Sequence, residues 1–225
     1  MPKLYVVGTP IGNLEDITLR ALRVLSEVDI ILCEDTRVTR KLLSKYEIKT
    51  KTLSYSSDDP SKSSSVIKLL EEGKNIALVS DAGTPGISDP GSVLVSKIRE
   101  HFEIIAIPGP SALTAFLSIA GVPFSEFTFL GFLPHKKGRE TLFKEIAASQ
   151  RAMVFYESPH RILKTLESLK THFGSYSTKR IIIGRELTKV FEEVVSGNPE
   201  DLLLYFEKNP EKVRGEFVVL VTNSA

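Results

Sequence analysis

Residues 76–91, IALVSDAGTPGISDPG, combine the residue types that a small-ligand site needs. An apolar, strand-like run leads into a loop of glycine, proline and aspartate, and glycine lets a backbone approach a ligand closely because it has no Cβ. The side-chain donors and acceptors of the loop are Asp81, Thr84, Ser88 and Asp89. Asp89 before Pro90 predicts a helix N-cap and first helical position, so the loop should end at free backbone amides. The segment therefore predicts a site for a small polar ligand.

Two further loops have the same character, GTPIGNLEDIT at residues 8–18 and IPGPSALTA at residues 107–115. In the first loop, Pro10 takes the second glycine position of G-x-G-x-x-G and removes a backbone donor, which argues against a standard dinucleotide site. The alternative for this loop is a tight turn capped by Asp16. In the second loop, Gly109 allows close approach and Ser111 opens a helix whose free amides can receive a carboxylate, with a simple N-cap as the alternative. Three such loops at one sheet edge favour ligand binding.

Four polar clusters lie at residues 33–41, 134–140, 156–161 and 184–193, with the sequences CEDTRVTRK, PHKKGRE, YESPHR and GRELTKVFEE. Three of them directly follow an apolar strand, so their charges belong at strand ends and not on the solvated face of a helix. Their cations predict a surface that follows a phosphate backbone. These cations are Arg37, Arg40, Lys41, Lys136, Lys137, Arg139, Arg161, Arg185 and Lys189. The alternative, which we favour for PHKKGRE taken alone, is solubility and ion pairing.

The composition is that of an ordinary globular protein, with 42% hydrophobic and 25% charged residues among 225. The net charge of +1 argues neither for nor against nucleic acid. P-loop lysine, H-E-x-x-H, paired-cysteine and G-x-S-x-G motifs do not occur, so phosphoryl transfer, zinc chemistry and a serine triad lack their usual parts and no metal is expected. The single cysteine, Cys33, is expected in the core. Without a signal-peptide pattern or a membrane-length apolar run, the sequence predicts a cytoplasmic protein.

Apolar runs of strand length alternate with amphipathic segments, which predicts an α/β fold with largely parallel sheets. Strands are predicted at residues 4–8, 29–33, 76–80, 104–109, 127–132, 152–157, 180–184 and 217–222, with an antiparallel candidate at 190–197. Helices are predicted at residues 17–28, 64–73, 93–102, 112–121, 160–173 and 200–209. The polar run at 54–65 is predicted to be a surface loop or lid. A break at AGVPFSE, residues 120–126, divides the chain into predicted domains 1–120 and 121–225.

Seven blocks occur in order along the chain: GTPIGNLEDIT, CEDTR, SDAGTPGISDPG, PGPSA, F-x-GF-x-P, FYESPHR and GRELTK. This set resembles the tetrapyrrole methylase superfamily and, within it, the enzymes that methylate a cytidine ribose 2′-oxygen of small-subunit ribosomal RNA. The likeness covers residues 4 to about 221. It implies two α/β domains of the tetrapyrrole methylase type, with the cofactor loops in domain 1–120 and domain 121–225 completing a cleft between them. It also implies bound S-adenosylmethionine, a homodimer, and 16S rRNA in the small ribosomal subunit as substrate.

The superfamily's cofactor-contacting positions carry over, by resemblance, to Pro10, Ile11, Thr84, Ile87, Ser111, Ala112, Tyr156, Glu186 and Glu216. Many members have G-D-P where this chain has Gly83-Thr84-Pro85, so an aspartate that could hold a ribose is missing there. Either Asp81 or Asp89 is expected to replace it. Longer RNA-modifying members carry a C-terminal extension that these 225 residues do not include, so part of their RNA contact is not expected here.

The implied reaction transfers a methyl group from a sulfonium to a ribose 2′-hydroxyl by in-line displacement, for which positioning contributes up to about 7 to 11 kcal/mol. A general base would add about 10²- to 10⁴-fold. The candidate bases are Glu34, Asp35, Glu157, Glu186 and Lys189. We favour Glu186 with Lys189 as its partner and retain Asp35 as a further catalytic candidate.

The RNA contacts expected from the resemblance are Arg37, Arg40, Lys136, Lys137, Arg139, Arg161 and Arg185, and the possible stacking surfaces for a splayed-out base are Phe132, Phe155 and Tyr156. Core packing is the alternative for each aromatic ring. Two rival functions stay open: a methylase of the same superfamily that acts on a tetrapyrrole or diphthine precursor, and a non-enzymatic module that binds a nucleotide or RNA.

Overall fold

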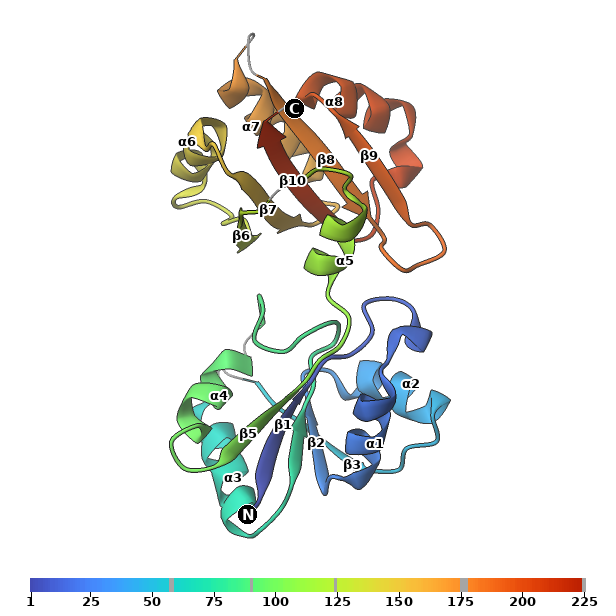
Figure 1. The fold of residues 1–225 in the computed structure, drawn as a ribbon, viewed down its shortest axis with the longest axis vertical. Helices are drawn as coiled ribbons and strands as arrows, with labels where there is room; N and C mark the ends of the chain where they lie inside the picture. Colours follow the sequence, from blue (N-terminus) through green and yellow to red (C-terminus); the bar gives the residue numbers. More distant parts are fainter. Residues whose placement is uncertain (57–58, 90, 124, 175–177, 224–225) are drawn as a thin grey trace. The chain divides into compact units, whose positions relative to one another are not determined.

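The computed structural model describes residues 1–56, 59–89, 91–123, 125–174 and 178–223 (Figure 1). Contacts divide the chain into two compact units, Met1–Ser111 and Ala112–Ala225, here called the first and second units. The second unit thus includes helix α5 (Ala112–Ile119), which the sequence-based division at residues 120–121 assigns to the first domain. Within the described residues, no helix is both long enough and apolar enough to span a membrane.

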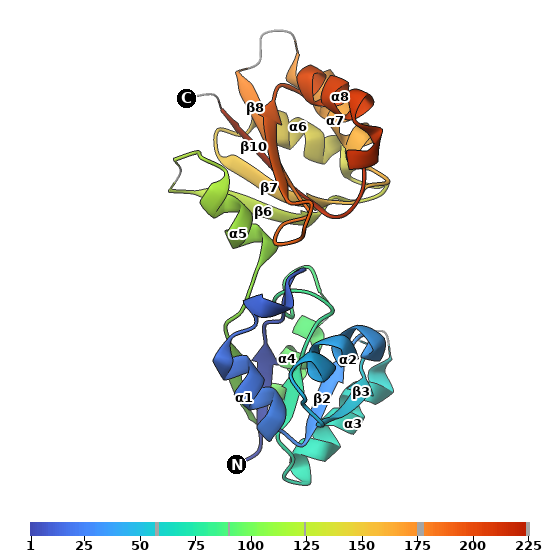
Figure 2. The same ribbon diagram turned by 90° about the vertical axis from the view of Figure 1, so that its right-hand side faces the viewer.

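The first unit is a parallel five-stranded sheet between two layers of helices. Its strands are β1 (Lys3–Val7), β2 (Ile30–Cys33), β3 (Lys51–Ser54), β4 (Ile76–Leu78) and β5 (Glu103–Ile107), in the order β3-β2-β4-β1-β5. Its helices are α1 (Leu19–Glu27), α2 (Thr36–Lys45), α3 (Pro60–Glu71) and α4 (Gly91–Ile98), with a short helix η1 (Leu14–Asp16). Figure 2 shows α1 on one face of the sheet, and the two hydrophobic clusters place α1 and α2 on that face and α3 and α4 on the other. Cys33 is buried under α2, as predicted.

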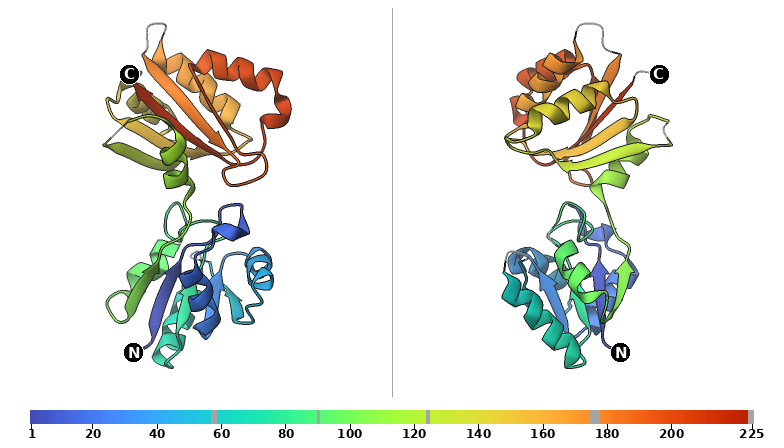
Figure 3. Two further views of the ribbon diagram at one scale, coloured as in Figure 1. Left: turned by 45° about the vertical axis from the view of Figure 1, so that its right-hand side comes forward. Right: turned by 90° about the vertical axis from the view of Figure 1, so that its left-hand side faces the viewer.

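The second unit is a mixed sheet with helices on both faces. Its strands are β6 (Phe127–Phe132), β7 (Ala152–Glu157), β8 (Lys179–Arg185), β9 (Glu193–Gly197) and β10 (Phe217–Asn223), in the order β6-β7-β10-β8-β9. Helices α6 (Arg139–Ala148), α7 (Ile162–Phe173) and α8 (Pro199–Lys208) cover one face, and a short helix η2 (Pro210–Lys212) follows α8 (Figure 3). Helix α5 packs on the other face, where the ring of Phe116 fills the space beside Gly184.

The prediction of largely parallel sheets is correct for the first unit and wrong for the second. Among the strands of the described residues there, only β6 and β7 pair in parallel, because β10 lies antiparallel between β7 and β8 and β9 pairs antiparallel with β8. A strand buried on both faces reads as the same apolar run in either direction, so its composition does not reveal its orientation. The predicted antiparallel strand near residues 190–197 is confirmed as β9, which pairs with β8.

Several elements were missed, and one predicted loop is partly helical. The missed elements are β3, α2, α6 and the two short helices η1 and η2. Of the polar run 54–65, the part from Pro60 onward belongs to α3, because the side chain of Asp59 accepts from the backbone N–H of Ser61 and caps the helix. Residues 57–58 of that run lie outside the described residues.

Candidate active site

The three glycine- and proline-rich loops of the first unit lie together at the carboxyl edge of its sheet, as predicted. The backbone N–H of Thr9 donates to the carbonyl of Gly83 over 2.9 Å, and the N–H of Gly83 donates back over 3.1 Å. The third loop joins them through Gly109, because a Cβ placed on Gly8 would lie 2.8 Å from the Gly109 Cα. All the strands of this sheet run in parallel, so the loops after β1, β4 and β5 must meet at one edge.

Asp89 organises the loop after β4. Its Oδ1 accepts from the backbone N–H of Gly86 over 3.0 Å and from that of Gly91, the first residue of α4, over 2.7 Å. This agrees with the predicted cap, while Pro90 lies outside the described residues. Ser88 has a φ of 56°, in the left-handed region, so the loop turns sharply just before the helix.

The first loop is capped differently from the turn that the sequence suggested. Asn13 Oδ1 accepts from the N–H of Glu15 over 3.1 Å, and Thr18 Oγ1 accepts from the N–H of Ala21 at the start of α1 over 3.1 Å. The interpretation of Asp16 as the cap is therefore wrong, because Asp16 lies inside η1.

Most of the cofactor positions expected in these loops have little exposed surface. Pro10 and Ile11 are buried, and Thr84, Ser111 and Ala112 are half-buried. Ile87 is 50% exposed, so an apolar side chain stands out of an otherwise polar loop. Loops rich in glycine and proline, with one exposed apolar side chain beside polar ones, can hold a flat ligand that carries both polar edges and apolar faces.

Two further acidic residues stand at the end of β2. Asp35 is the N-cap of α2: its Oδ1 accepts from the N–H of Arg37 over 2.8 Å, and its Oδ2 lies 2.7 Å from Arg37 Nη2. The hydrogen bonds from Arg37 hold the pKa of Asp35 at about 2. Asp35 also donates its N–H to Asp81 Oδ1 over 3.1 Å, which joins the loops after β2 and β4.

Glu34 has the opposite electrostatic environment. A hydrogen bond to the side chain of Asp89, together with burial and the negative charges of Asp89 and Asp81, raises the pKa of Glu34 to about 8. Two carboxyl groups that share a hydrogen bond hold one proton between them. Since Asp89 already accepts two backbone N–H groups, Glu34 is the partner that carries this proton at neutral pH.

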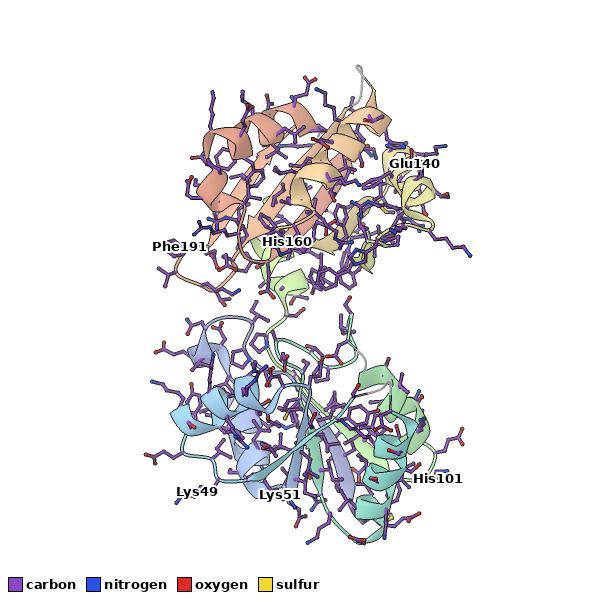
Figure 4. The ribbon with its side chains drawn as sticks, turned by 180° about the vertical axis from the view of Figure 1, so that it is seen from behind. Lys49, Lys51, His101, Glu140, His160 and Phe191 are labelled. Carbon is purple, nitrogen blue, oxygen red and sulfur yellow. The ribbon has the colours of Figure 1, made fainter. Side chains whose placement is uncertain are left out.

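The second unit gathers its motifs at one edge of its sheet. Strands β6, β7 and β8 run in the same direction, so their carboxyl ends lie together with the beginning of β10. Figure 4 shows His160, after β7, and Phe191, between β8 and β9, at this same end of the unit. The blocks F-x-GF-x-P, FYESPHR and GRELTK therefore share an edge.

Glu186, Lys189 and Glu216 form one ion-pair network at that edge. Lys189 Nζ lies 2.8 Å from Glu186 Oε1 and 2.9 Å from Glu216 Oε2. The backbone N–H of Glu186 donates to the Glu216 carbonyl over 3.0 Å, and the N–H of Glu216 donates to Glu186 Oε1 over 3.2 Å. Glu186 and Thr188 have φ values of 50° and 65°, so the turn holds two non-glycine residues in the left-handed region.

The network shifts both of its titrating partners toward the charged form. Burial acts to raise the pKa of Glu186, but hydrogen bonds from Lys189 and from the Glu216 amide outweigh it and hold the pKa below its ordinary value. Burial acts to lower the pKa of Lys189, but the carboxylates of Glu186 and Glu216 raise it above its ordinary value. Neither group is thus poised to accept a proton near neutral pH.

Arg139 and Arg161, both expected at an RNA surface, instead turn toward a buried carboxylate. Glu157 is 1% exposed, and its Oε1 lies 2.7 Å from Arg161 Nη2 while its Oε2 lies 3.7 Å from Arg139 Nη2. Thr165 Oγ1 donates to Glu157 Oε2 over 2.7 Å. The sequence reasoning missed Thr165, although it interrupts the apolar stripe of α7 and so signals a buried hydrogen bond.

The other predicted RNA contacts fall into two groups. Arg185 is buried and reaches Glu193 Oε2 over 3.4 Å, and Arg37 pairs with Asp35. Arg37 is nevertheless exposed, with 86% of its side-chain surface accessible, and the other exposed members of the set are Arg40, Lys136 and Lys137. Arg185, like Arg139 and Arg161, therefore has a partner inside the protein.

The aromatic residues predicted as stacking surfaces differ in how exposed they are. Phe155 lies in the core with no exposed surface, so its interpretation as a stacking surface is wrong. Phe132 is 55% exposed, and its ring centroid lies 5.4 Å from that of the half-buried Tyr156. The ring of Phe129, which sequence reasoning did not select, lies 5.0 Å from Tyr156 in an edge-to-face contact.

The chain is similar to known proteins in both sequence and fold. The family model described as Tetrapyrrole (Corrin/Porphyrin) Methylases matches residues 3–203. "Ribosomal RNA small subunit methyltransferase I" of Thermotoga maritima is 47% identical over 224 residues and is covered, like this chain, to 99%. Proteins of the same name are 46% identical in Borrelia garinii subsp. bavariensis, with 99% of both chains covered, and 43% identical in Escherichia coli O157:H7, with 97% of this chain and 77% of the relative covered.

Solved structures with similar folds are also methyltransferases. The methyltransferase CobJ matches with a TM-score of 0.73 at 22% identity, covering 100% of this chain and 95% of that chain. Uroporphyrin-III-C-methyltransferase from Thermus thermophilus matches with a TM-score of 0.67 at 21% identity, covering 98% of this chain and 94% of that chain. These matches confirm the α/β fold of the tetrapyrrole methylase type.

Proposed function

The chain belongs to the tetrapyrrole methylase family, and on that premise we propose that it transfers a methyl group from S-adenosylmethionine to the 2′-hydroxyl of a cytidine in 16S rRNA. The observation that carries this proposal is the near-complete match to relatives named for small-subunit ribosomal RNA, at 46 and 47% identity with 99% of both chains covered. The solved structures with similar folds, which include a cobalt precorrin-4 methyltransferase and uroporphyrin-III-C-methyltransferase, are much more distant, at 16 to 22% identity.

We place S-adenosylmethionine at the carboxyl edge of the first unit's sheet. The main chain of the three joined loops would hold its polar groups, and the exposed side chain of Ile87 would cover an apolar face. When bound, this cofactor supplies a methyl group on a sulfonium, which is already activated for in-line displacement by an oxygen. Asp81 accepts one backbone N–H through Oδ1, whereas Asp89 accepts two backbone N–H groups through Oδ1 and also shares a hydrogen bond with Glu34, so Asp81 is the aspartate that we propose for contact with a ribose. Tyr156, Glu186 and Glu216 stay predicted cofactor contacts.

The chain's own chemical task is to take the proton of the 2′-hydroxyl, and we assign it to Glu34. Four of the five candidates already have strong partners: Asp35 binds Arg37, Glu157 binds two arginines, and Glu186 pairs with Lys189. Glu34 alone has another carboxyl group as its partner, and its raised pKa suits a base that works near neutral pH. This replaces the favoured assignment to Glu186 and Lys189, whose network instead fixes the turn after β8.

The decisive experiment mixes the protein with labelled S-adenosylmethionine and, in parallel, naked 16S rRNA, small ribosomal subunits and uroporphyrinogen. We expect label in the RNA, and 2′-O-methylcytidine after digestion to nucleosides. Label in uroporphyrinogen instead would support the superfamily rival, and binding without any S-adenosylhomocysteine would support the non-enzymatic module. We also propose a cytoplasmic location, because a ribosomal substrate would be found there, and the homodimer stays a prediction.

A further inference from the structure

Residues 132–137, FLPHKK, present an exposed aromatic ring and exposed cations on one short segment. Phe132 ends strand β6 with 55% of its surface exposed, while the next residue, Leu133, is buried. His135, Lys136 and Lys137 are all exposed. The segment thus turns one apolar side chain inward and leaves the ring and the charges outside.

The position of the Phe132 ring is set by an irregularity in the sheet. The register between β6 and β7 shifts between Phe129 and Phe132, and Gly131 within this bulge has a φ of +62°. A bulge redirects the side chains that follow it. Phe132 consequently pairs with Tyr156, whose ring lies 5.4 Å away at 58° and is itself braced by Phe129 at 5.0 Å.

The rest of the segment is held from inside the second unit. Arg161 Nη1 donates to the carbonyl of Leu133 over 2.8 Å, and Arg139 Nη1 donates to the carbonyl of Pro134 over 3.1 Å. Both guanidinium groups are fixed in turn by the buried carboxylate of Glu157. The two arginines therefore hold the main chain of the segment between Phe132 and the lysines. A segment that is already ordered loses less conformational entropy when it binds a partner.

We propose that residues 132–137 bind single-stranded RNA, with an unpaired base stacked on Phe132 and neighbouring phosphates on Lys136 and Lys137. Single-strand binding sites combine aromatic platforms with cations along the backbone in this way. The four residue steps from Phe132 to Lys136 span at most about 14 Å, which places base and phosphate contacts on adjoining nucleotides. In this arrangement Arg139 and Arg161 are positioning residues that do not contact RNA.

The charges around the segment favour RNA over a protein partner. The segment contains no carboxylate. Glu140 follows it at the start of α6 (Figure 4), and its Oε1 lies 2.8 Å from His172 Nε2. The proposal rests on the proposed function and deepens it, because it names the part of the chain that would receive the RNA.

The test measures binding of a short cytidine-containing single-stranded RNA over a series of salt concentrations, using the full chain. Phe132→Ala should weaken binding by about 5- to 150-fold, while Phe132→Trp should retain it. Lys136→Ala/Lys137→Ala should reduce the slope of log affinity against log salt by about 1.4, or about 0.7 for each phosphate contact. The matched control Lys144→Ala/Lys164→Ala removes two exposed charges from α6 and α7 and should leave that slope unchanged.

Several results would overturn the proposal. Unchanged affinity in Phe132→Ala would do so, as would full affinity in Phe132→Leu, because leucine is apolar but cannot stack. If Phe132→Ala or Lys136→Ala/Lys137→Ala lost binding to small ribosomal subunits but bound naked RNA with unchanged affinity, the segment would contact a protein instead of RNA. The proposed function fails separately: wild-type protein that binds RNA through these residues but transfers no methyl group would refute the methyltransferase alone.

Discussion

Gly8 and Gly109 pack main chain against main chain, and a Cβ on Gly109 would lie 2.7 Å from the carbonyl carbon of Gly8. This contact joins the loop after β1 to the loop after β5, so the proposed cofactor site depends on it.

Gly109→Ala should therefore destabilise the protein by about 1 to 3 kcal/mol, because neither backbone can move aside without disturbing the loop it carries. Calorimetric affinity for S-adenosylmethionine should fall as well. Gly73→Ala is the matched control: Gly73 has a φ of +87° and an added Cβ would meet no other atom within 4 Å, so the change costs about 1 kcal/mol of backbone strain and should leave cofactor affinity intact. Equal cofactor affinity in both variants would contradict this account.

Glu157→Gln should lower the free energy of unfolding by about 3 to 5 kcal/mol, measured by urea denaturation. The substitution keeps the shape of the side chain but leaves Arg139 and Arg161 buried without their counter-charge. The control is Glu140→Gln. The Glu140 side chain is 72% exposed in its pair with His172, so loss of that ion pair should lower the free energy of unfolding by at most about 1 kcal/mol. A similar small cost in both variants would show that the buried pair contributes little.

Glu34→Gln should reduce methyl transfer by about 10²- to 10⁴-fold and remove its pH dependence. In the unchanged protein, single-turnover rates should rise with pH and level off above about 8, because Glu34 must lose its proton before it can act as a base. The control Asp35→Asn keeps a side chain that can cap α2 and should preserve the pH profile. A profile that persists in Glu34→Gln would assign the base elsewhere.

The same carboxyl group makes a prediction about stability. Because folding raises the pKa of Glu34 from 4.5 to about 8, the folded protein binds this proton more tightly than the unfolded chain does. Its contribution to stability is fully present below pH 4.5 and is lost as the pH rises through about 8, where Glu34 loses its proton. Thermal unfolding from pH 5 to 9 should accordingly show a steeper decline in the unchanged protein than in Glu34→Gln.

Lys189→Met should raise the pKa of Glu186 toward its ordinary value, because it removes the first hydrogen-bond donor that holds the carboxylate charged. Folding lowers the pKa of Glu186, so the ion pair between Glu186 and Lys189 stabilises the folded protein at any pH above the pKa of Glu186 in the unfolded chain. This stabilisation is lost as the pH falls through the pKa of Glu186 in the folded protein. NMR titration of the Glu186 carboxyl group would measure this change. An unaltered titration would mean that the Glu216 amide is sufficient by itself.

How much of the fold could be predicted depended on how apolar each element is. The strands β1, β2, β4 and β10 were predicted because a short, continuous apolar run bounded by turn residues is typical of a buried strand. Strand β3 was missed because it lies at the edge of the sheet with two of its four residues exposed, so its sequence lacks such a run. Helix α2 was missed because its polar residues were read as a binding cluster, although Asp35 at its N-cap marks a helix start.

The site was harder to predict, because a cluster of charges in a sequence does not indicate where its side chains point. YESPHR and PHKKGRE each contributed one arginine to the interior, and the partner that draws them there, Glu157, became evident only when β7, α6 and α7 were packed together. By contrast, the predicted loops of the first unit were found at one edge because parallel strands require it.

The support of residues 132–137 from inside the second unit changes how natural variants of this chain should be judged. A ranking of substitutions by their distance from bound nucleic acid would score a change at Glu157 as harmless. Glu157 nevertheless fixes the two arginines that hold the main chain between Phe132 and the exposed lysines. Damage to recognition can thus originate deep in the interior, and screens that sample surface positions alone would overlook it.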